Sequence, residues 1–184
     1  MEIKYRTQFG ELLESLGLEG PACEIGVAEG RNSQVLISSP AITKLYMIDA
    51  WTHLEQAGDG GHPQSWHDIN YSEAHERVEP WREKAVIMKG LTSEMIKLIP
   101  DNSLVLAYID ADHSYEGTYG DLTGVYNKVK KGCIIAGHDY LNHFYGVHRA
   151  VETFLAFNGY SEQDIHVTEE DGDQSMVSFW FIKK

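Results

Sequence analysis

Two apolar segments of this 184-residue sequence end in carboxylates, and those carboxylates are the first candidates for chemistry. The run over residues 104–109 leads into Asp110, and the run over residues 133–137 leads into His138 and Asp139. Neighbouring strands of a parallel sheet lie ~4.8 Å apart, and their carboxyl ends share one edge. If the two runs are adjacent parallel strands, Asp110 and Asp139 face a single ligand or ion at that edge.

A glycine-containing turn is the second candidate site. Residues 24–30, Glu-Ile-Gly-Val-Ala-Glu-Gly, join a strand to a helix, and the missing β-carbons of Gly26 and Gly30 would let a ligand approach the backbone. Ala28 stands where a dinucleotide-binding loop has its second glycine, which disfavours an NAD enzyme. Asp49 ends the next strand, where an acid can bind both hydroxyls of a ribose. The pattern predicts a nucleoside ligand without a diphosphate.

Alternating strands and helices must position these residues. Strands are expected at residues 22–27, 44–49, 84–89, 104–109 and 133–137. A C-terminal hairpin is expected to pair residues 165–168 with 176–182 across a turn at 171–173. This order predicts an α/β fold, with a Rossmann-like open and mostly parallel sheet, helices on both faces and a C-terminal antiparallel hairpin.

Helical spacing and capping residues locate the first connecting helices. Apolar residues within 9–16 predict a short amphipathic helix that ends near Gly17. Asn32 and Ser33 are expected to cap the helix that follows the glycine turn. Thr92 or Ser93 is expected to cap a helix that ends before Pro100.

The later helices and one irregular stretch complete the chain. Apolar residues at i, i+3, i+4 and i+7 predict a helix from Leu122 through Val129, with Gly132 just past its end. Another helix is expected around residues 147–155. The stretch 51–81, with a helix-like segment at about 70–78, is interpreted as a flap within a single domain that spans residues 1–184.

Composition limits the classes of partner. The formal net charge of −13 and the pI near 5.0 disfavour nucleic acid and anionic membrane as partners. The sequence has no 18-residue apolar stretch and begins without an apolar signal region, so a cytoplasmic location is expected. Cys23 and Cys133 open predicted strands without metal-binding spacing, and we interpret both as packing thiols.

On these residues, the sequence resembles the class I S-adenosylmethionine-dependent methyltransferases over nearly its whole length. Glu24, Gly26 and Gly30 match the E/D-x-G-x-x-x-G motif of that family, and Asp49 stands in the place of its ribose-binding acid. Residues 110–116 and 137–140 resemble the branch of small O-methyltransferases that includes the catechol, caffeoyl-CoA and macrolide-sugar enzymes. The resemblance implies S-adenosylmethionine as cofactor, bound by Glu24, Ile25, Gly26, Val27, Gly30, Ser33, Asp49, Ala50, Trp51, Thr92, Ser93 and Asp110.

The resemblance also implies a reaction, which is methyl transfer to a hydroxyl of a small-molecule or sugar-like acceptor. The acceptor loses a proton, and histidine titrates near working pH. His113 or His138, which lie beside Asp139 in the expected catalytic group, could therefore be the general base, with His113 favoured. A non-catalytic nucleoside-binding or S-adenosylmethionine-binding module is the alternative function.

A magnesium ion is the alternative way to activate the acceptor. In the resembled branch, the aspartates that correspond to Asp110 and Asp139 often hold Mg²⁺, and carboxylates with waters suit this ion. Asp112 is as well suited to capping the next helix as to binding a metal. Tyr140 departs from the asparagine that catechol-type enzymes have at this place, which leaves the metal open.

Overall fold

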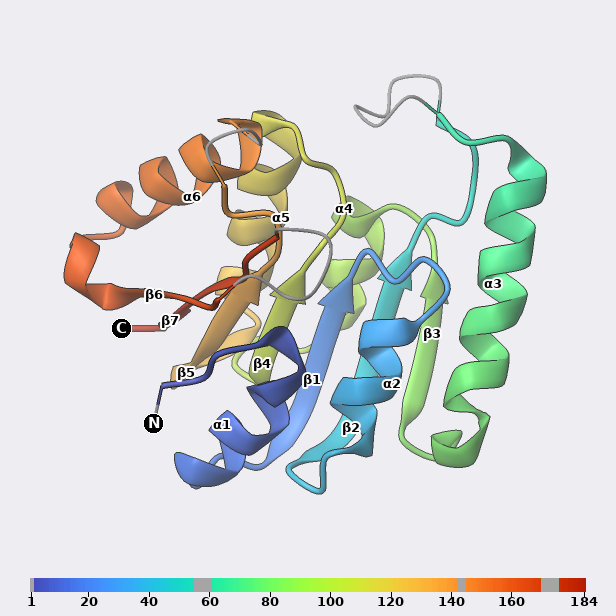
Figure 1. The fold of residues 1–184 in the computed structure, drawn as a ribbon, viewed down its shortest axis with the longest axis horizontal. Coiled ribbons are helices and arrows are strands. Elements are labelled where there is room, and N and C mark those ends of the chain that lie inside the picture. The colour runs from blue at the N-terminus through green and yellow to red at the C-terminus, as the bar shows by residue number, and fades with distance from the viewer. Residues whose placement is uncertain (1, 55–60, 142–144, 170–175) are drawn as a thin grey trace.

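The computed structural model describes residues 2–54, 61–141, 145–169 and 176–184. A seven-stranded sheet runs through it in the order β3-β2-β1-β4-β5-β7-β6, and Figure 1 shows the strands side by side. The first five are parallel, whereas β7 runs antiparallel to both β5 and β6. The strands are β1 (Gly20–Ile25), β2 (Ile42–Asp49), β3 (Ala85–Lys89), β4 (Leu104–Ile109), β5 (Val129–Gly137), β6 (Ile165–Val167) and β7 (Phe179–Ile182).

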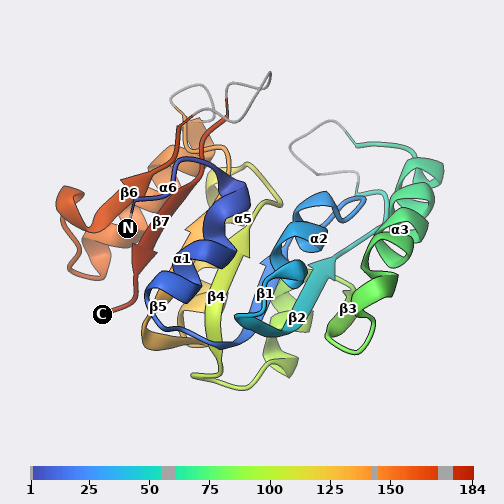
Figure 2. The ribbon, with the colours of Figure 1, turned by 60° about the horizontal axis from the view of Figure 1, so that its bottom comes forward.

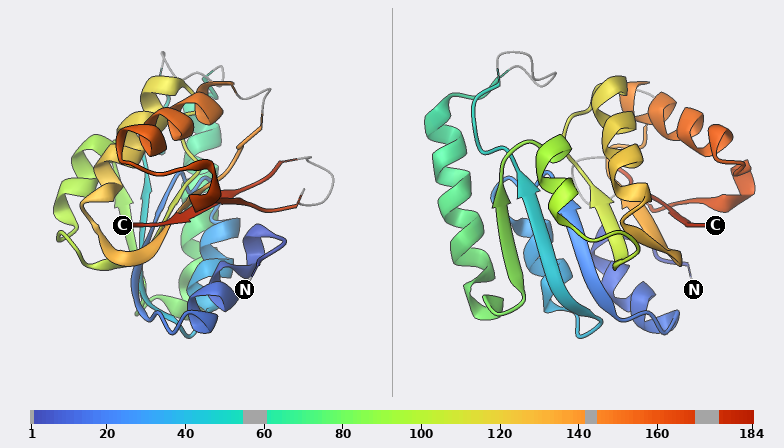
Figure 3. Two further views of the ribbon diagram at one scale, coloured as in Figure 1. Left: turned by 90° about the vertical axis from the view of Figure 1, so that its left-hand side faces the viewer. Right: turned by 180° about the vertical axis from the view of Figure 1, so that it is seen from behind.

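Helices cover both faces of this sheet, as expected. The two groups are seen on opposite sides in Figures 2 and 3, with α1, α2 and α3 on one face and α4, α5 and α6 on the other. The helices are α1 (Phe9–Ser15), α2 (Arg31–Ser38), α3 (Gln64–Val78), α4 (Thr92–Met95), α5 (Tyr115–Tyr126) and α6 (Tyr145–Phe157). Among the described residues, no helix combines the length and apolar character that crossing a membrane requires.

The apolar runs of the sequence form the core because parallel strands covered on both faces must be apolar throughout. Every residue of β4 is buried, and the side chains of Phe9, Leu12 and Leu13 from α1 are buried against the sheet. Cys23 and Cys133 are buried free thiols, which confirms their interpretation as packing residues. The Rossmann-like fold with its C-terminal hairpin is therefore confirmed, while the hairpin turn at 171–173 lies outside the described residues.

The prediction of a helix through Val129 is wrong. Helix α5 ends at Tyr126, and Val129 begins β5, where it pairs with Leu104 of β4. Lateral pairing with β4 overrides the helical spacing at this point, and a register irregularity follows between Leu104 and Leu106. Gly132 consequently lies inside β5 with a φ of +80° instead of ending a helix.

The capping predictions also need correction. Gly30 is the N-cap of α2, and the side chains of Asn32 and Ser33 donate to Glu24 instead. Leu91 is the N-cap of α4, so Thr92 is the first helical residue. At the start of α2, the tertiary contact with Glu24 competes with local capping.

Much of the expected flap is regular structure. Helix α3 begins at Gln64, six residues before the helix-like segment we expected, and buries Asn70, Ala74 and Val78. Trp51 at the start of the same stretch is fully buried. Residues 55–60 lie outside the described part, so the flap prediction stays open there.

The glycines of the turn after β1 lie in close packing contacts. Gly26 has a φ of +82°, and a β-carbon there would lie 1.9 Å from the carbonyl oxygen of Asp110. Gly30 has a φ of +81°, and its β-carbon would lie 3.1 Å from Cα of Ala74 in α3. Close packing against β4 and α3 therefore favours glycine at both positions.

We expect Gly26→Ala to destabilise the protein far more than Gly17→Ala. Both glycines have a left-handed φ, of +82° and +66°, which costs alanine about 1–2 kcal/mol. Gly17 has no neighbour within 4 Å of an added β-carbon, whereas the change at Gly26 also forces the backbone of Asp110 to move. Urea unfolding of the two variants measures the difference, and equal losses would contradict the close contact with β4.

Candidate active site

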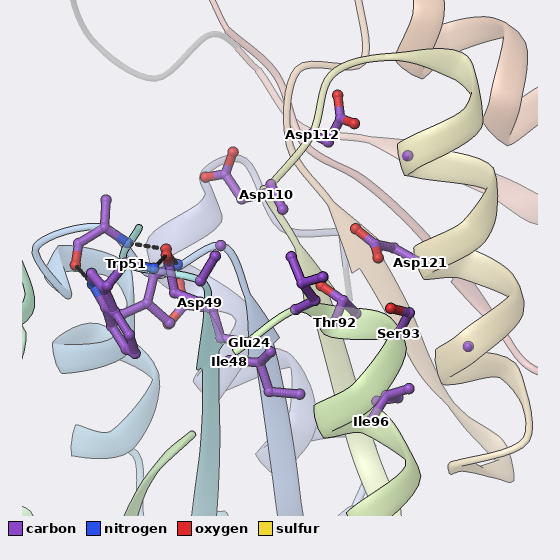
Figure 4. Close-up of a pocket in the computed structure, with 18 of the residues that line it drawn as sticks. Glu24, Ile48, Asp49, Trp51, Thr92, Ser93, Ile96, Asp110, Asp112 and Asp121 are labelled. Atoms are coloured by element: carbon purple, nitrogen blue, oxygen red, sulfur yellow. Dashed lines mark hydrogen bonds between the residues drawn. The ribbon is translucent and has the colours of Figure 1, made fainter. Parts of the chain in front are cut away.

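A cleft of about 1500 Å³ crosses the carboxyl ends of β1, β2 and β4. Pockets for one drug-sized ligand span roughly 300–1,000 Å³, so this cleft has room for two molecules side by side. Figure 4 shows Asp49 and Trp51 on one side, Asp110 at the end of β4, and Thr92 and Asp121 on the other side. The cleft therefore lies at the carboxyl edge of the sheet, where we expected the chemistry.

Most of the expected cofactor-binding residues line this cleft. Glu24, Gly26, Val27, Asp49, Ala50, Trp51, Thr92, Ser93 and Asp110 all do so. Ile25, Gly30 and Ser33 do not border it. Ile25 and Ser33 are fully buried, Ser33 behind the Glu24 carboxylate to which it donates. These three residues lie next to residues that line the cleft but do not line it themselves.

The Asp49 carboxylate is bonded to the turn after β1. Its Oδ2 accepts hydrogen bonds from the amides of Val27 and Ala28, both at 2.9 Å, and its Oδ1 accepts from the amide of Trp51 at 2.8 Å. The Trp51 indole donates back to the carbonyl of Ala28 at 2.9 Å. A carboxylate has about four acceptor positions, two on each oxygen, so Oδ1 keeps capacity for a donor from a ligand in the cleft.

Glu24 is a buried carboxyl group at the end of β1. It is 1% exposed and accepts from the Asn32 amide at 2.8 Å and from the Ser33 hydroxyl. Burial raises the pKa of Glu24 to about 8, and these hydrogen bonds reduce the rise only in part. The group is therefore largely neutral at neutral pH.

The structure brings Asp110, Asp139 and both candidate histidines together. The strands β4 and β5 are parallel neighbours, with Ile109 paired to Gly137, so Asp110 and Asp139 leave the sheet side by side. Nε2 of His113 lies 2.8 Å from Oδ2 of Asp139 and 3.9 Å from Oδ1 of Asp110. Nδ1 of His138 lies 3.3 Å from Oδ1 of Asp139 and 3.7 Å from Oδ1 of Asp110.

The four groups differ in access to the cleft. Asp110 and His113 line it, and the His113 side chain is 33% exposed. Neither His138 nor Asp139 lines it, and both side chains are less than a tenth exposed. A molecule in the cleft therefore meets His113 directly and Asp139 only through His113.

The carboxylates hold the His113 ring in its charged form. Hydrogen bonding to Asp110 and to Asp139 raises the pKa of His113 to about 10, against a smaller opposing effect of burial. Burial raises the pKa of Asp139, but the hydrogen bonds with His113 and His138 outweigh it and hold this pKa well below its usual range. The resting cluster is an imidazolium between two carboxylates.

A divalent metal fits the same three side chains. The ligand atoms of Asp110, His113 and Asp139 all lie within 4.8 Å of one another, the only such group among the described residues. Two carboxylates suit Mg²⁺, while an imidazole is more typical of transition metals. Asp112 is not in this group. The prediction that it caps α5 is wrong as well, because Ser114 is the N-cap and its side chain accepts from Gly117, while Oδ1 of Asp112 accepts from the amide of Ser114.

Sequence reasoning missed several cleft residues. Arg6, from the 3₁₀ turn Arg6–Gln8, lines the cleft, and its guanidinium lies 3.8 Å from Oδ2 of Asp110. Ile48, Ile96 and Asp121 also line it. No local pattern marks these positions, because only the folded chain brings the N-terminal turn and α5 to the same edge.

Comparisons with known proteins agree with this geometry. A sequence model described as a methyltransferase domain matches residues 23–140. No curated protein matches the chain in a sequence search.

Solved structures share the fold at low sequence identity. The O-methyltransferase NovP has a TM-score of 0.67 and 18% identity, over 97% of this chain and 78% of that one. An O-methyltransferase from Bacillus cereus in complex with S-adenosylhomocysteine has a TM-score of 0.69 and 14% identity, over 97% and 80%. An rRNA methylase from Streptococcus thermophilus has a TM-score of 0.64 and 12% identity, over 95% and 93%. At these identities the likeness shows the fold and does not choose an acceptor.

The buried Glu24 gives a stability prediction. Its pKa is higher in the folded chain than in the unfolded one, so the folded state binds the proton more tightly and loses stability as pH rises from about 4.5 through about 8. Glu24→Gln removes this ionisation. We expect thermal melts of the variant to match the wild type near pH 5 and to exceed it at pH 9.

The matched control is Glu76→Gln on the exposed side of α3, for which no such divergence is expected. A Glu24→Gln variant whose melting temperature follows the wild type at both pH values would show that Glu24 is not the titrating group.

Proposed function

Because this chain belongs to the methyltransferase domain family and has the fold of its class I, S-adenosylmethionine-dependent members, we propose that it methylates a hydroxyl oxygen of a small-molecule or sugar-like acceptor. The observation that carries the proposal is one cleft with Asp49 at the end of β2 and His113 held at the ends of β4 and β5. The part of the cleft beside Asp49 suits a nucleoside, and the part beside His113 suits proton transfer.

The proposed cofactor position follows from the acids along the cleft. The Asp49 carboxylate, which borders the cleft at the end of β2, accepts a hydrogen bond from a ribose hydroxyl through the remaining position on Oδ1. The amino-acid end of the cofactor lies toward Glu24 and Asp110, where Arg6 supplies a cation beside two acids. This zwitterionic end would find opposite charges for both its ammonium and its carboxylate.

Methyl transfer is then an in-line displacement that requires positioning and the removal of one proton. The acceptor oxygen forms a bond to the methyl carbon while the carbon–sulfur bond breaks, which leaves S-adenosylhomocysteine and a methyl ether. His113 takes the acceptor's proton, after its own ring proton has passed to solvent through the exposed side of the ring. Asp139 orients His113, and His138 in turn holds Asp139.

A magnesium ion, when bound, would be held by Asp110 and Asp139 next to His113 and would lower the pKa of the acceptor hydroxyl. Either His113 or such an ion accounts for deprotonation of the acceptor, and a chelator distinguishes them. Transfer that persists in EDTA assigns the step to His113, whereas loss that Mg²⁺ restores assigns it to the ion.

A small acceptor is supported by charge. The chain has a formal net charge of −13, and a phosphate backbone would be repelled by the acids that surround the cleft. The O-methyltransferase neighbours support oxygen as the methylated atom, although an rRNA methylase shares the fold. Charge therefore favours a small hydroxylated molecule over nucleic acid.

Titration calorimetry followed by a transfer assay tests the proposal. We expect S-adenosylhomocysteine to bind with a dissociation constant in the micromolar range or below, and NAD not to bind. Labelled methyl should then pass from S-adenosylmethionine to members of a panel of small hydroxylated acceptors. Failure to bind S-adenosylhomocysteine would refute the proposal, and binding without transfer to any acceptor would point to a non-catalytic module.

His113→Gln should separate binding from chemistry. General-base catalysis contributes about 10²–10⁴-fold, so we expect the transfer rate to fall by about 10²-fold or more while the affinity for S-adenosylhomocysteine is kept. His148→Gln is the control, because His148 stacks on Tyr140, with ring centroids 4.7 Å apart, and does not line the cleft. Equal transfer rates in the two variants would rule out His113 as the base.

A further inference from the structure

Three aromatic rings near the start of α3 border the cleft, and the reaction described above does not use them. The His62 ring stacks on the Trp66 ring, with ring centroids 4.1 Å apart and an interplanar angle of 20°. The His67 ring meets the Trp66 ring edge-on, with ring centroids 5.0 Å apart. All three residues line the cleft, and Trp66 is 37% exposed. We call His62, Trp66 and His67 the aromatic wall.

Hydrogen bonds hold the aromatic wall to the segment that follows β2. Nε2 of Gln64 donates to the carbonyl of Trp51 at 3.2 Å, and its Oε1 accepts from the amide of His53 at 3.1 Å. Nδ1 of His53 lies 2.8 Å from the carbonyl oxygen of His62. The amide of Trp51 donates to Asp49, so the wall is attached to the strand end that carries this acid. Rings that are fixed before a ligand arrives lose little freedom on binding.

The aromatic wall leaves apolar surface open inside the cleft. Exposed apolar residues that are scattered singly need no explanation, but Leu54 and Trp66, 38% and 37% exposed, both border this cleft. Aromatic side chains in a concave site are typical of ligand pockets. The near-parallel stack of His62 on Trp66 also shows that flat rings fit face to face here. The wall therefore suits a flat apolar part of a ligand.

The aromatic wall and His113 lie at different strand ends. Helix α3 follows β2, whereas His113 follows β4, and β1 lies between these two strands. Figure 1 shows the start of α3 and the start of α5 on opposite sides of the end of β1. Neighbouring strands are ~4.8 Å apart, so two spacings separate the two groups by roughly 10 Å. A single ring that presents its own hydroxyl to His113 is too short to reach the wall.

We infer that the acceptor has two parts, a hydroxyl-bearing part at His113 and a flat unsaturated ring that extends the stack of His62 on Trp66. The inference rests on the proposed function, which assigns His113 to the acceptor and the space beside Asp49 to the cofactor. The cleft of about 1500 Å³ has room for both molecules. The remote ring takes part in no bond that forms or breaks, so it determines which acceptors bind and leaves the transfer step as written above.

Titration calorimetry on the full chain, saturated with S-adenosylhomocysteine, tests the inference. The probes are phenyl β-D-glucoside and cyclohexyl β-D-glucoside, which carry the same hydroxyls and differ in whether the remote ring is flat. Burial of apolar surface alone does not favour the phenyl probe, because the cyclohexyl ring is no smaller. Stacked ring pairs contribute beyond their burial, so we expect the wild type to bind the phenyl probe about threefold to tenfold more tightly.

Trp66→Leu should remove this preference. Leucine keeps an apolar side chain but has no ring, so we expect the affinities for the two probes to come within about twofold. The affinity for S-adenosylhomocysteine should stay at the wild-type value. Phe157→Leu is the matched control, because Phe157 is an aromatic residue that is 81% exposed and does not border the cleft. This variant should keep the wild-type preference.

The outcomes are separable. If the wild type binds S-adenosylhomocysteine but binds both probes equally or not at all, the inference is overturned without any variant, so a variant that fails to fold cannot hide the answer. A Trp66→Leu variant that keeps the preference also overturns it. A loss of S-adenosylhomocysteine affinity of about tenfold in that variant would assign the wall to the cofactor and overturn it as well. Absence of S-adenosylhomocysteine binding by the wild type would instead refute the proposed function.

Discussion

The hydrogen bonds of the Asp49 carboxylate determine the shape of the site. Three backbone amides donate to it, two from the turn after β1 and one from the segment after β2. Because both oxygens are engaged, the ends of the two strands keep a fixed separation, and Ala28 and Trp51 are held at positive φ values of 46° and 40°. A single side chain thus sets the turn and also borders the cleft where a nucleoside would lie.

Several acidic side chains of the site are buried, and burial disfavours their charged form. Glu24 and Asp121 both have a raised pKa, in each case mainly because burial disfavours the charged form. At the other end of the cleft, Asp139 keeps its charge because two histidines surround it. The cleft therefore combines buried carboxyl groups that are largely neutral with a charged cluster where an acceptor would lose its proton. A cationic sulfonium between these two regions meets mostly acids.

The sequence predicts the sheet well because its strands are buried on both faces and appear as continuous apolar runs. It predicts the meeting of Asp110 and Asp139 for the same reason, since parallel neighbours share an edge. It fails where a tertiary contact competes with a local preference. Asn32 and Ser33 have the types of helix caps but bond to Glu24, and Val129 fits a helical pattern but pairs with Leu104. Asp121 could not be found at all, because a lone acid within a helix resembles a solvated one.

The contact between Gly26 and the carbonyl of Asp110 has a consequence for how this architecture can diversify. It joins the turn after β1 to the end of β4 through main-chain atoms, so neither segment can shift without moving the other. A mutation that displaces the end of β4 therefore also displaces the turn after β1. Segments that are attached to this junction, but are not part of it, can change without moving the two strand ends.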